Sequence, residues 1–347
     1  MIISVIGARP QFVKAAVVCK ALDQHAIQHE VIHTGQHYDE KMSDVFWNEL
    51  GLPECALNLA VGSGTQGVQT ARMIEKLEEY LMQRADKVTA VLIYGDTNST
   101  LATSIVASKL HIPIIHVEAG LRSFNREMPE EINRIVTDHL SSVLFCSSDD
   151  AVKQLTTEGI MKNVYNVGDV MFDAVLNFSK EAASKFKPSD IFPAAEKGFN
   201  LLTLHRPSNT ESVGNLASIL AALDAIAAPV IWPVHPRIKS KINTLKLSKH
   251  IHIVDPLSYF QMMVMLSSCN KVFTDSGGLQ KEAYWLQKPC ITLRQETEWT
   301  ETCHHNWNVI CGADTAKIIH AYQTTIDTST WIPLYGNGTA SDSIATI

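Results

Sequence analysis

The sequence predicts an α/β fold of two doubly wound, Rossmann-like domains. The chain has 347 residues, which suits two domains that each bury a core of their own. Short, almost continuously apolar runs alternate with amphipathic stretches, the pattern of parallel strands covered by helices on both faces. The strand, loop and helix order of the first residues starts again at residues 198–204, which indicates a second domain of similar build.

The predicted strands are apolar runs bounded by turn residues. In the first half they cover residues 2–6, 31–34, 90–94, 112–117, 143–146 and 164–167. In the second half they cover residues 200–204, 230–233, 251–254, 271–274 and 290–293. Helical patterns lie between them, for example at 67–82, 100–110 and 216–226. Because crossovers between parallel strands are right-handed, we expect a doubly wound sheet in each half and a boundary within residues 169–187.

Composition narrows the class of function. The net charge is -7 and no basic block runs along the chain, so the electrostatic footprint of a nucleic-acid binder is missing. Residues 1–7 have the pattern of a buried strand rather than a leader, and no apolar run reaches the roughly 18–20 residues of a membrane span. The seven cysteines are scattered, as in a reduced cytoplasmic protein. Cys303-His304-His305 lacks a second ligand pair at zinc spacing, so we expect no metal.

Polar and titratable residues follow many of the predicted strands. Since ligands bind outside the carboxyl ends of strands in an open parallel sheet, these positions are the candidate site. They are Ala8-Arg9-Pro10-Gln11, Gly95-Asp96-Thr97-Asn98, Glu118-Ala119-Gly120-Leu121-Arg122, His205-Arg206, Val234-His235-Pro236-Arg237 and Asp275-Ser276-Gly277-Gly278. Any one of them could be an ordinary turn, but together they predict that the chemistry lies at one end of both sheets.

The segment Asp275–Gly278 has the pattern of an anion site. Its glycines let a phosphate approach the backbone where a helix begins, and the free N–H groups and the helix dipole favour negative charge. Glu282 follows about one turn later, where a carboxylate can accept hydrogen bonds from ribose hydroxyls. The GxGxxG spacing within residues 61–67 does not follow a long buried strand, so we expect no nicotinamide cofactor.

The stretch from Asn125 to Arg134 is the second informative segment. Pro129 suits a first helical turn, and Glu130 stands four residues before Arg134 on one helix face. Helix capping with a surface ion pair would explain these residues in isolation. However, Glu118 lies only twelve residues before Glu130, and carboxylates that converge on one site are what general acid–base catalysis needs.

Taken together, these motifs resemble the non-hydrolysing UDP-N-acetylglucosamine 2-epimerases. The resemblance covers nearly the whole chain, with the motifs in family order. The segments that carry it are Gly7–Lys14, Tyr94–Thr100, His116–Arg122, Pro129–Arg134, Thr274–Gly278 and Arg294–Glu298.

The resemblance implies an isomerase with a GT-B-like fold, an active site in the interdomain cleft, no cofactor and a homodimeric assembly. It implies that residues 1–172 carry the catalytic carboxylates, that residues 173–334 bind UDP, and that residues 335–347 cross back to the first domain. The catalytic positions would be Asp96, Glu118, Glu130, Arg134 and His205. The substrate would be held by Arg9, Lys14, His235, Ser276, Gly277, Gly278, Glu282 and Arg294.

The reaction would be an elimination followed by re-addition. The C2 proton of the sugar has no adjacent carbonyl, so simple enolisation is unavailable, and transient oxidation would need a nicotinamide. A base can instead remove the C2 proton while UDP leaves C1, giving a 2-acetamidoglycal to which UDP adds back. This route needs carboxylates near both faces of C2 and donors that stabilise the leaving diphosphate. Which carboxylate serves which face stays open.

Two substrates stay open as well, with a slight preference for the first. Residues 7–12 and the pair Glu298-Trp299 depart from the usual N-acetylglucosamine enzymes and look more like the subgroup acting on UDP-2,3-diacetamido-2,3-dideoxy-glucuronic acid, which feeds surface polysaccharide such as lipopolysaccharide. The other substrate is UDP-N-acetylglucosamine. A GT-B glycosyltransferase and a non-catalytic UDP-sugar sensor are the competing readings, although neither requires the three carboxylates together.

Overall fold

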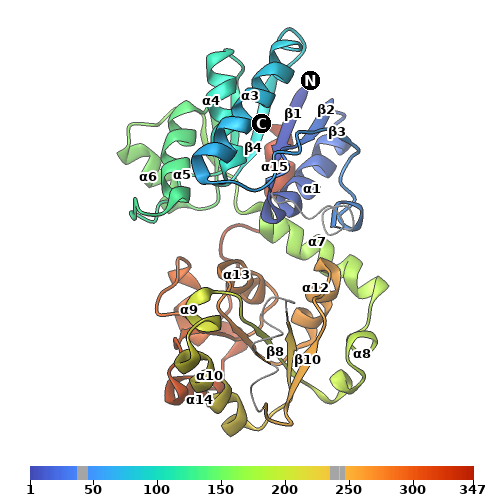
Figure 1. Cartoon of the computed structure of the whole chain (residues 1–347), viewed down its shortest axis with the longest axis vertical. Helices are drawn as coiled ribbons and strands as arrows, with labels where there is room; N and C mark the ends of the chain where they lie inside the picture. The colour runs from blue at the N-terminus through green and yellow to red at the C-terminus, as the bar shows by residue number, and fades with distance from the viewer. Residues whose placement is uncertain (37–45, 235–241, 243–246) are drawn as a thin grey trace. The chain divides into compact units, whose positions relative to one another are not determined.

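The structure is a computed structural model that describes residues 1–36, 46–234, 242 and 247–347. The chain divides into two compact units (Figure 1). Unit 1 contains Met1–Ala174 and Tyr335–Ile347, and unit 2 contains Val175–Leu334. His235, one of the predicted substrate contacts, lies outside the described residues.

Unit 1 contains a parallel sheet whose described strands run in the order β3-β2-β1-β4-β5-β6-β7. These strands are β1 (Ile2–Ile6), β2 (His29–His33), β3 (Cys55–Asn58), β4 (Ala90–Tyr94), β5 (Ile114–Ala119), β6 (Val143–Cys146) and β7 (Val164–Asn166). Its helices are α1 (Arg9–Gln24), α3 (Gln66–Met82), α4 (Asn98–Lys109), α5 (Pro129–Leu140), α6 (Asp149–Thr157) and α15 (Ala340–Thr346), and α7 (Val170–Lys185) leads into unit 2. Helices α3, α4 and α5 pack in sequence beside one another (Figure 1).

Unit 2 repeats the design with a described strand order of β10-β9-β8-β11-β12-β13, again all parallel. Its strands are β8 (Asn200–Thr203), β9 (Val230–Pro233), β10 (Ile251–Val254), β11 (Val272–Thr274), β12 (Cys290–Thr292) and β13 (Asn308–Ile310). Its α-helices are α8 (Pro188–Ile191), α9 (Pro207–Thr210), α10 (Val213–Ile226), α12 (Tyr259–Ser268), α13 (Gly277–Trp285) and α14 (Thr315–Gln323). The described part of unit 2 also contains three short 3₁₀ helices: η1 (Pro193–Lys197), η2 (Thr300–Asn306) and η3 (Thr328–Thr330).

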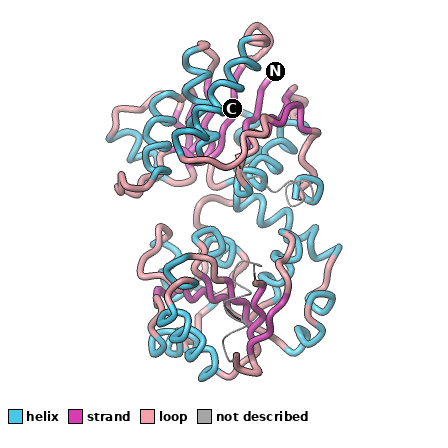
Figure 2. Tube along the Cα trace, viewed as in Figure 1, coloured by secondary structure: helices cyan, strands magenta, loops and turns pink. Residues whose placement is uncertain are grey.

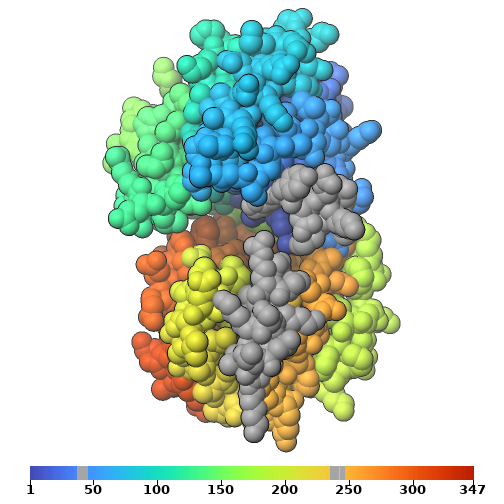
Figure 3. All heavy atoms as spheres, in the orientation of Figure 1, coloured from blue at the N-terminus to red at the C-terminus, as the bar shows by residue number. Residues whose placement is uncertain are grey.

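Each sheet is buried between helices, which explains why the strands are apolar on both faces (Figure 2). In unit 1, Met73, Leu77 and Leu81 stand four residues apart on α3 and pack their shared face into the core. In unit 2, Trp232 of β9 and Phe273 of β11 are fully buried in the corresponding core. The space-filling view shows α3 at the surface of unit 1 (Figure 3), where Val68 and Met82 are exposed on it.

The last residues of the chain belong to unit 1. Helix α15 packs against α1. Its first turn is held by Asp173, whose carboxylate accepts hydrogen bonds from the backbone N–H groups of Ala340 and Ser341 at 3.1 and 2.7 Å. The N–H of Asp169 donates to the carbonyl of Tyr335 at 2.7 Å, so the returning segment is bonded into unit 1 at both points.

The expected α/β class with two doubly wound sheets is confirmed. The strand order reverses between β1 and β4 in unit 1 and between β8 and β11 in unit 2. Such switch points are where open α/β sheets bind ligands. The short strands β3 and β13 were not expected, and two predicted strands have shifted bounds: β2 covers His29–His33 instead of 31–34, and β5 covers Ile114–Ala119 instead of 112–117. None of the described helices is long and apolar enough to span a membrane.

Candidate functional site

The ends of β1 and β4 are tied together by Gln11, a buried residue in the first turn of α1. Its Oε1 accepts hydrogen bonds from the N–H groups of Gly7 and Ala8 at 2.8 and 3.0 Å. Its Nε2 donates to the carbonyl of Tyr94 at 2.8 Å and to Thr100 Oγ1 at 3.0 Å. The amide therefore fixes the loops on both sides of the switch point in unit 1.

Lys14 and Glu118 form an ion pair at this switch point. Their side chains come from α1 and β5 and are 9% and 13% exposed. Burial alone would lower the pKa of Lys14, but the charges of Glu118 and Asp169 outweigh it and raise that pKa, so Lys14 is held as the cation. A Cβ on Gly95 would lie 3.1 Å from Glu118 Oε2 and 3.4 Å from Lys14 Nζ, so the pair rests against the glycine that follows β4.

The backbone of Glu118 is unusual. The register between β5 and β6 shifts between Val117 and Ala119, which places Glu118 at a bulge inside the strand. Its φ is +72°, in the left-handed region that a glutamate adopts only at a cost of roughly 1–3 kcal/mol. Bulges and strained residues of this kind gather at functional sites because they aim a side chain that a regular strand would point elsewhere.

Asp96 belongs to a second charged group, bridged by Arg134 of α5. Arg134 Nη2 donates to Asp96 Oδ2 at 2.6 Å, and its Nη1 donates to Glu131 Oε2 at 3.0 Å. Glu131 is 1% exposed and also accepts the N–H groups of Ser123 and Phe124, both at 2.8 Å. Burial alone would raise the pKa of Glu131, but these hydrogen bonds lower it overall. Arg134 therefore links the β4 loop to a carboxylate that orders the β5–α5 loop.

Glu130 lies in the first turn of α5, after Pro129 as the sequence suggested, and is exposed. The surface ion pair between Glu130 and Arg134, which would have explained this spacing in isolation, is not the one that forms. Among the described residues, Arg134 pairs with Glu131, which is on the buried face of α5, and with Asp96 after β4, while Glu130 is exposed.

Arg9 is the first residue of α1 and is exposed just after β1. Its guanidinium lies over the ring of Phe46, 4.6 Å from the ring centroid. This cation–π contact holds a cationic group at the carboxyl end of the sheet, where an anion can reach it.

In unit 2, Asp275 organises the ends of β8 and β11. It is fully buried, and its carboxylate accepts the N–H groups of His205 and Arg206 at 3.1 Å and Nδ2 of Asn209 at 3.1 Å. His205 Nδ1 lies 3.0 Å from Asp275 Oδ1, while the histidine side chain is 56% exposed. Burial alone would raise the pKa of Asp275, but the contacts with His205 lower it. The carboxylate thus fixes the orientation of the His205 ring.

Helix α13 begins at the predicted anion site. Ser276 is its N-cap, and its hydroxyl accepts the N–H of Leu279 at 3.4 Å. A Cβ on Gly278 would meet nothing within 4 Å, so the space beside this helix start is open. A Cβ on Gly277 would lie 3.6 Å from Arg294 Nη1, which places that guanidinium beside the helix start. Backbone N–H groups of a first helical turn lack partners within the helix, so an anion can bind there.

Arg294 and Glu282 flank this helix start. Arg294 donates to both oxygens of Glu298 at 2.9 and 2.8 Å. Burial alone would raise the pKa of Glu298, but Arg294 lowers it. Glu282, in α13, is 9% exposed, and burial raises its pKa to about 7 although Lys281 opposes the shift. Because ionisation of Glu282 is costly here, its carboxyl group is suited to hydrogen bonds with neutral polar groups such as hydroxyls.

Three groups in the site were not among the predicted site residues: Asp275, Glu131 and a buried network around Asp138. Asp275 stands in the motif Asp275–Gly278, where the prediction gave a role to Ser276 and the two glycines but none to Asp275 itself. Glu131 and Asp138 stand seven residues apart, two helical turns, so both lie on the inward face of α5. The sequence could have indicated this through the seven-residue spacing, which puts both carboxylates on one helix face. If that face is buried, each carboxylate needs a hydrogen-bonding or charged partner.

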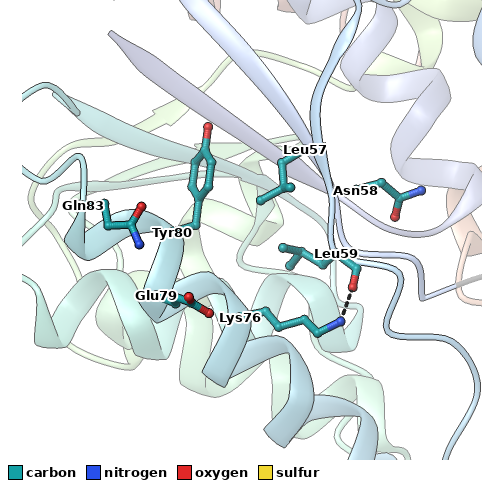
Figure 4. Close-up of a pocket in the computed structure, with 7 residues that line it drawn as sticks. All are labelled: Leu57, Asn58, Leu59, Lys76, Glu79, Tyr80 and Gln83. Carbon is teal, nitrogen blue, oxygen red and sulfur yellow. Dashed lines mark hydrogen bonds between the residues drawn. The ribbon is translucent and has the colours of Figure 1, made fainter.

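Two further features concern metal binding and a pocket away from the strand ends. Among the described residues, no group of three or more His, Cys, Asp or Glu side chains is placed to hold a metal ion. A pocket of about 340 Å³ lies between β3 and α3 and is lined by Leu57, Asn58, Leu59, Lys76, Glu79, Tyr80 and Gln83 (Figure 4). Lys76 Nζ donates to the Leu59 carbonyl there at 2.5 Å. The predicted residues Asp96 and Glu118 lie at the ends of β4 and β5 and do not line this pocket.

Comparison with known proteins agrees with this geometry. A family model described as UDP-N-acetylglucosamine 2-epimerase matches residues 20–347. A Pseudomonas aeruginosa protein named UDP-2,3-diacetamido-2,3-dideoxy-D-glucuronate 2-epimerase is 44% identical, over 99% of this chain and 98% of its own length. The crystal structure of Methanocaldococcus jannaschii UDP-GlcNAc 2-epimerase in complex with UDP-GlcNAc and UDP is 38% identical, covers 100% of this chain and 99% of its own, and has a TM-score of 0.87. The UDP-GlcNAc-bound Neisseria meningitidis enzyme is 27% identical with a TM-score of 0.86, covering 99% and 98%.

These likenesses confirm the expected GT-B-like, two-domain α/β fold. The chain therefore belongs to the non-hydrolysing UDP-N-acetylglucosamine 2-epimerase family, and the protein is an isomerase.

Proposed function

We propose that this protein inverts C2 of a UDP-linked 2-acetamido sugar by elimination and re-addition of UDP. The observation that carries the proposal is the pairing of Glu118 with Lys14 beside Gly95, at the switch point of unit 1. The pair sets a carboxylate beside a cation at the carboxyl end of the sheet, and a carboxylate can act as a general base. Asp96, in the loop after β4, is held by Arg134 and supplies a second carboxylate. Glu130 supplies a third, which is exposed.

The UDP half of the substrate suits unit 2. The diphosphate would accept from the helix start at Ser276, Gly277 and Gly278, with Arg294 beside it, and the ribose hydroxyls would bond to Glu282. Arg9, Lys14 and His235 are proposed as further substrate contacts. His205, oriented through Nδ1 by Asp275, keeps Nε2 available to the leaving diphosphate.

The reaction balances without an external reagent. A carboxylate takes the C2 proton, the C2–H electron pair forms the C1–C2 double bond, and the C1–O bond breaks with its electrons going to UDP. Re-addition of UDP at C1, with protonation of C2 on the opposite face, gives the epimer. Donors at the diphosphate stabilise the charge that develops as the C1–O bond breaks.

For the substrate, we propose UDP-2,3-diacetamido-2,3-dideoxy-glucuronate, with UDP-N-acetylglucosamine as the second candidate. The support is the name and the 44% identity of the Pseudomonas aeruginosa relative, together with the departures in residues 7–12 and at Trp299. We also propose a cytoplasmic homodimer that serves the synthesis of surface polysaccharide such as lipopolysaccharide.

Incubation of the purified protein with each UDP-sugar in D2O, without an acceptor, tests the proposal. We expect deuterium at C2 and a manno-configured product, with the larger kcat/KM for the diacetamido uronate. UDP-sugar binding without deuterium incorporation would instead indicate a sensor. Turnover that requires an added acceptor would indicate a glycosyltransferase, and either result would overturn the proposed reaction.

A further inference from the structure

Asp138 is a buried carboxylate that bonds to both sides of the Glu118 bulge. It lies near the end of α5 and its side chain is 0% exposed. Its Oδ1 lies 2.7 Å from His116 Nδ1, two residues before Glu118. Its Oδ2 accepts the N–H of Gly120, two residues after Glu118, at 3.1 Å. One side chain therefore fixes the positions on either side of the strained residue.

The same network reaches the glycine against which Glu118 rests. His116 Nε2 lies 2.8 Å from the carbonyl oxygen of Gly95. Both ring nitrogens of His116 therefore face oxygen atoms, Asp138 Oδ1 on one side and the Gly95 carbonyl on the other. The bulge of β5 and the end of β4 are thus held in one arrangement by the chain Asp138, His116, Gly95.

The outer part of the network anchors Asp138 itself. Arg122 Nη1 donates to Asp138 Oδ2 at 2.7 Å, and its Nε and Nη2 donate to the two oxygens of Glu158 at 2.8 and 2.7 Å. Burial alone would raise the pKa of Asp138, but His116 and Arg122 lower it, so the residue is held as a carboxylate. Glu158 shares Arg122 with Asp138, and among the described residues its other contacts are with Gln154 and His139, on the side of Arg122 away from the bulge's partners His116 and Gly120.

The geometry points to Asp138 as a positioning residue for the reaction: through His116 and Gly120 it holds Glu118 in the left-handed conformation that directs its carboxylate to Lys14 and Gly95. This inference rests on the proposed role of Glu118 in removing or returning the C2 proton. Asp138 does not itself touch the substrate. Its effect is therefore on turnover, not on the affinity for UDP.

The test compares Asp138→Asn with Glu158→Gln, two variants that each remove one carboxylate partner of Arg122. For each we would measure C2 deuterium incorporation in D2O, UDP affinity by calorimetry and the thermal midpoint. Asp138→Asn is expected to lower kcat on the order of 100-fold, the cost of a misplacement of about 1 Å, with KM and UDP affinity unchanged. Glu158→Gln is expected to lose thermal stability but to keep its turnover.

A turnover loss of the same size in both variants would overturn the inference, because it would then follow from general destabilisation of the network. If Asp138→Asn does not fold, His116→Asn replaces it, since asparagine keeps a donor for Asp138 and loses the contact with Gly95. That variant must show the same split between turnover and UDP affinity, and unchanged turnover would refute the inference. Glu118→Gln, measured in parallel, separates the positioning role of Asp138 from the proposed role of Glu118. If Glu118→Gln incorporates deuterium at C2 at the unaltered rate, it is the proposed role of Glu118 that is wrong.

Discussion

Replacing Gly95 with alanine is expected to disturb the reaction centre while leaving UDP binding intact. Gly95 has φ +63°, so alanine there costs about 1–2 kcal/mol of stability from the backbone alone. Its new Cβ would stand 3.1 Å from Glu118 Oε2, closer than such contacts normally are, so the carboxylate must shift by a few tenths of an ångström. Since a misplacement of about 1 Å costs about 100-fold in rate, we expect kcat to fall about 3- to 10-fold.

Gly51→Ala is the matched control for this variant. Gly51 has φ +65°, almost the same backbone conformation, but a Cβ there would meet nothing within 4 Å. Chemical denaturation should therefore give similar losses of stability for the two variants. C2 deuterium incorporation, followed by NMR in D2O, should fall only in Gly95→Ala. Equal exchange rates in both variants, or a loss explained by weaker UDP binding, would refute the assigned position of Glu118.

Three further substitutions probe the rest of the site. Between about pH 4.5 and 7, folded Glu282 keeps a proton that the unfolded chain has released, so the free energy of unfolding falls as pH rises through this window, by about 3 kcal/mol at most. The free energy of unfolding of Glu282→Gln, measured by denaturation at several pH values, should not show this decline. If it falls with pH in parallel with that of the unaltered protein, the burial argument is wrong. Asp275→Ala removes the acceptor of the His205 and Arg206 N–H groups and of the buried Asn209 side chain and is expected to cost roughly 1–3 kcal/mol, unlike the exposed Asp224→Ala, and equal unfolding midpoints would disprove its role. Arg134→Lys cannot bridge both carboxylates and should lower kcat at unchanged UDP affinity, a result to be read from steady-state rates and calorimetry.

The sequence predicted the sheets and the ends of their strands because buried parallel strands are apolar on both faces. The glycines at the start of α13 also predict an anion site from the local sequence, because small residues where a strand meets a helix let an anion approach the backbone. These features depend on neighbouring residues in the chain, and they placed Asp96, Ser276 and Gly278 at strand ends as found.

The conformation of Glu118 could not be predicted in the same way. No local pattern calls for a glutamate with positive φ, and the strand was expected to end before it. The conformation depends on Asp138, about twenty residues later, which bonds to both sides of the bulge. Similarly, helical spacing favoured Glu130 as the partner of Arg134, whereas burial of the inner face of α5 selects Glu131.

The central claim is that the Glu118 carboxylate works on the C2 proton and not on UDP. The most direct test is the rate of C2 deuterium incorporation by Glu118→Gln relative to the unaltered protein, with the UDP dissociation constant measured on the same samples. Glutamine keeps the size of the side chain and removes its basicity, so we predict that most of the exchange is lost at unchanged UDP affinity. Exchange at the unaltered rate, or a loss of UDP binding in its place, would contradict the claim.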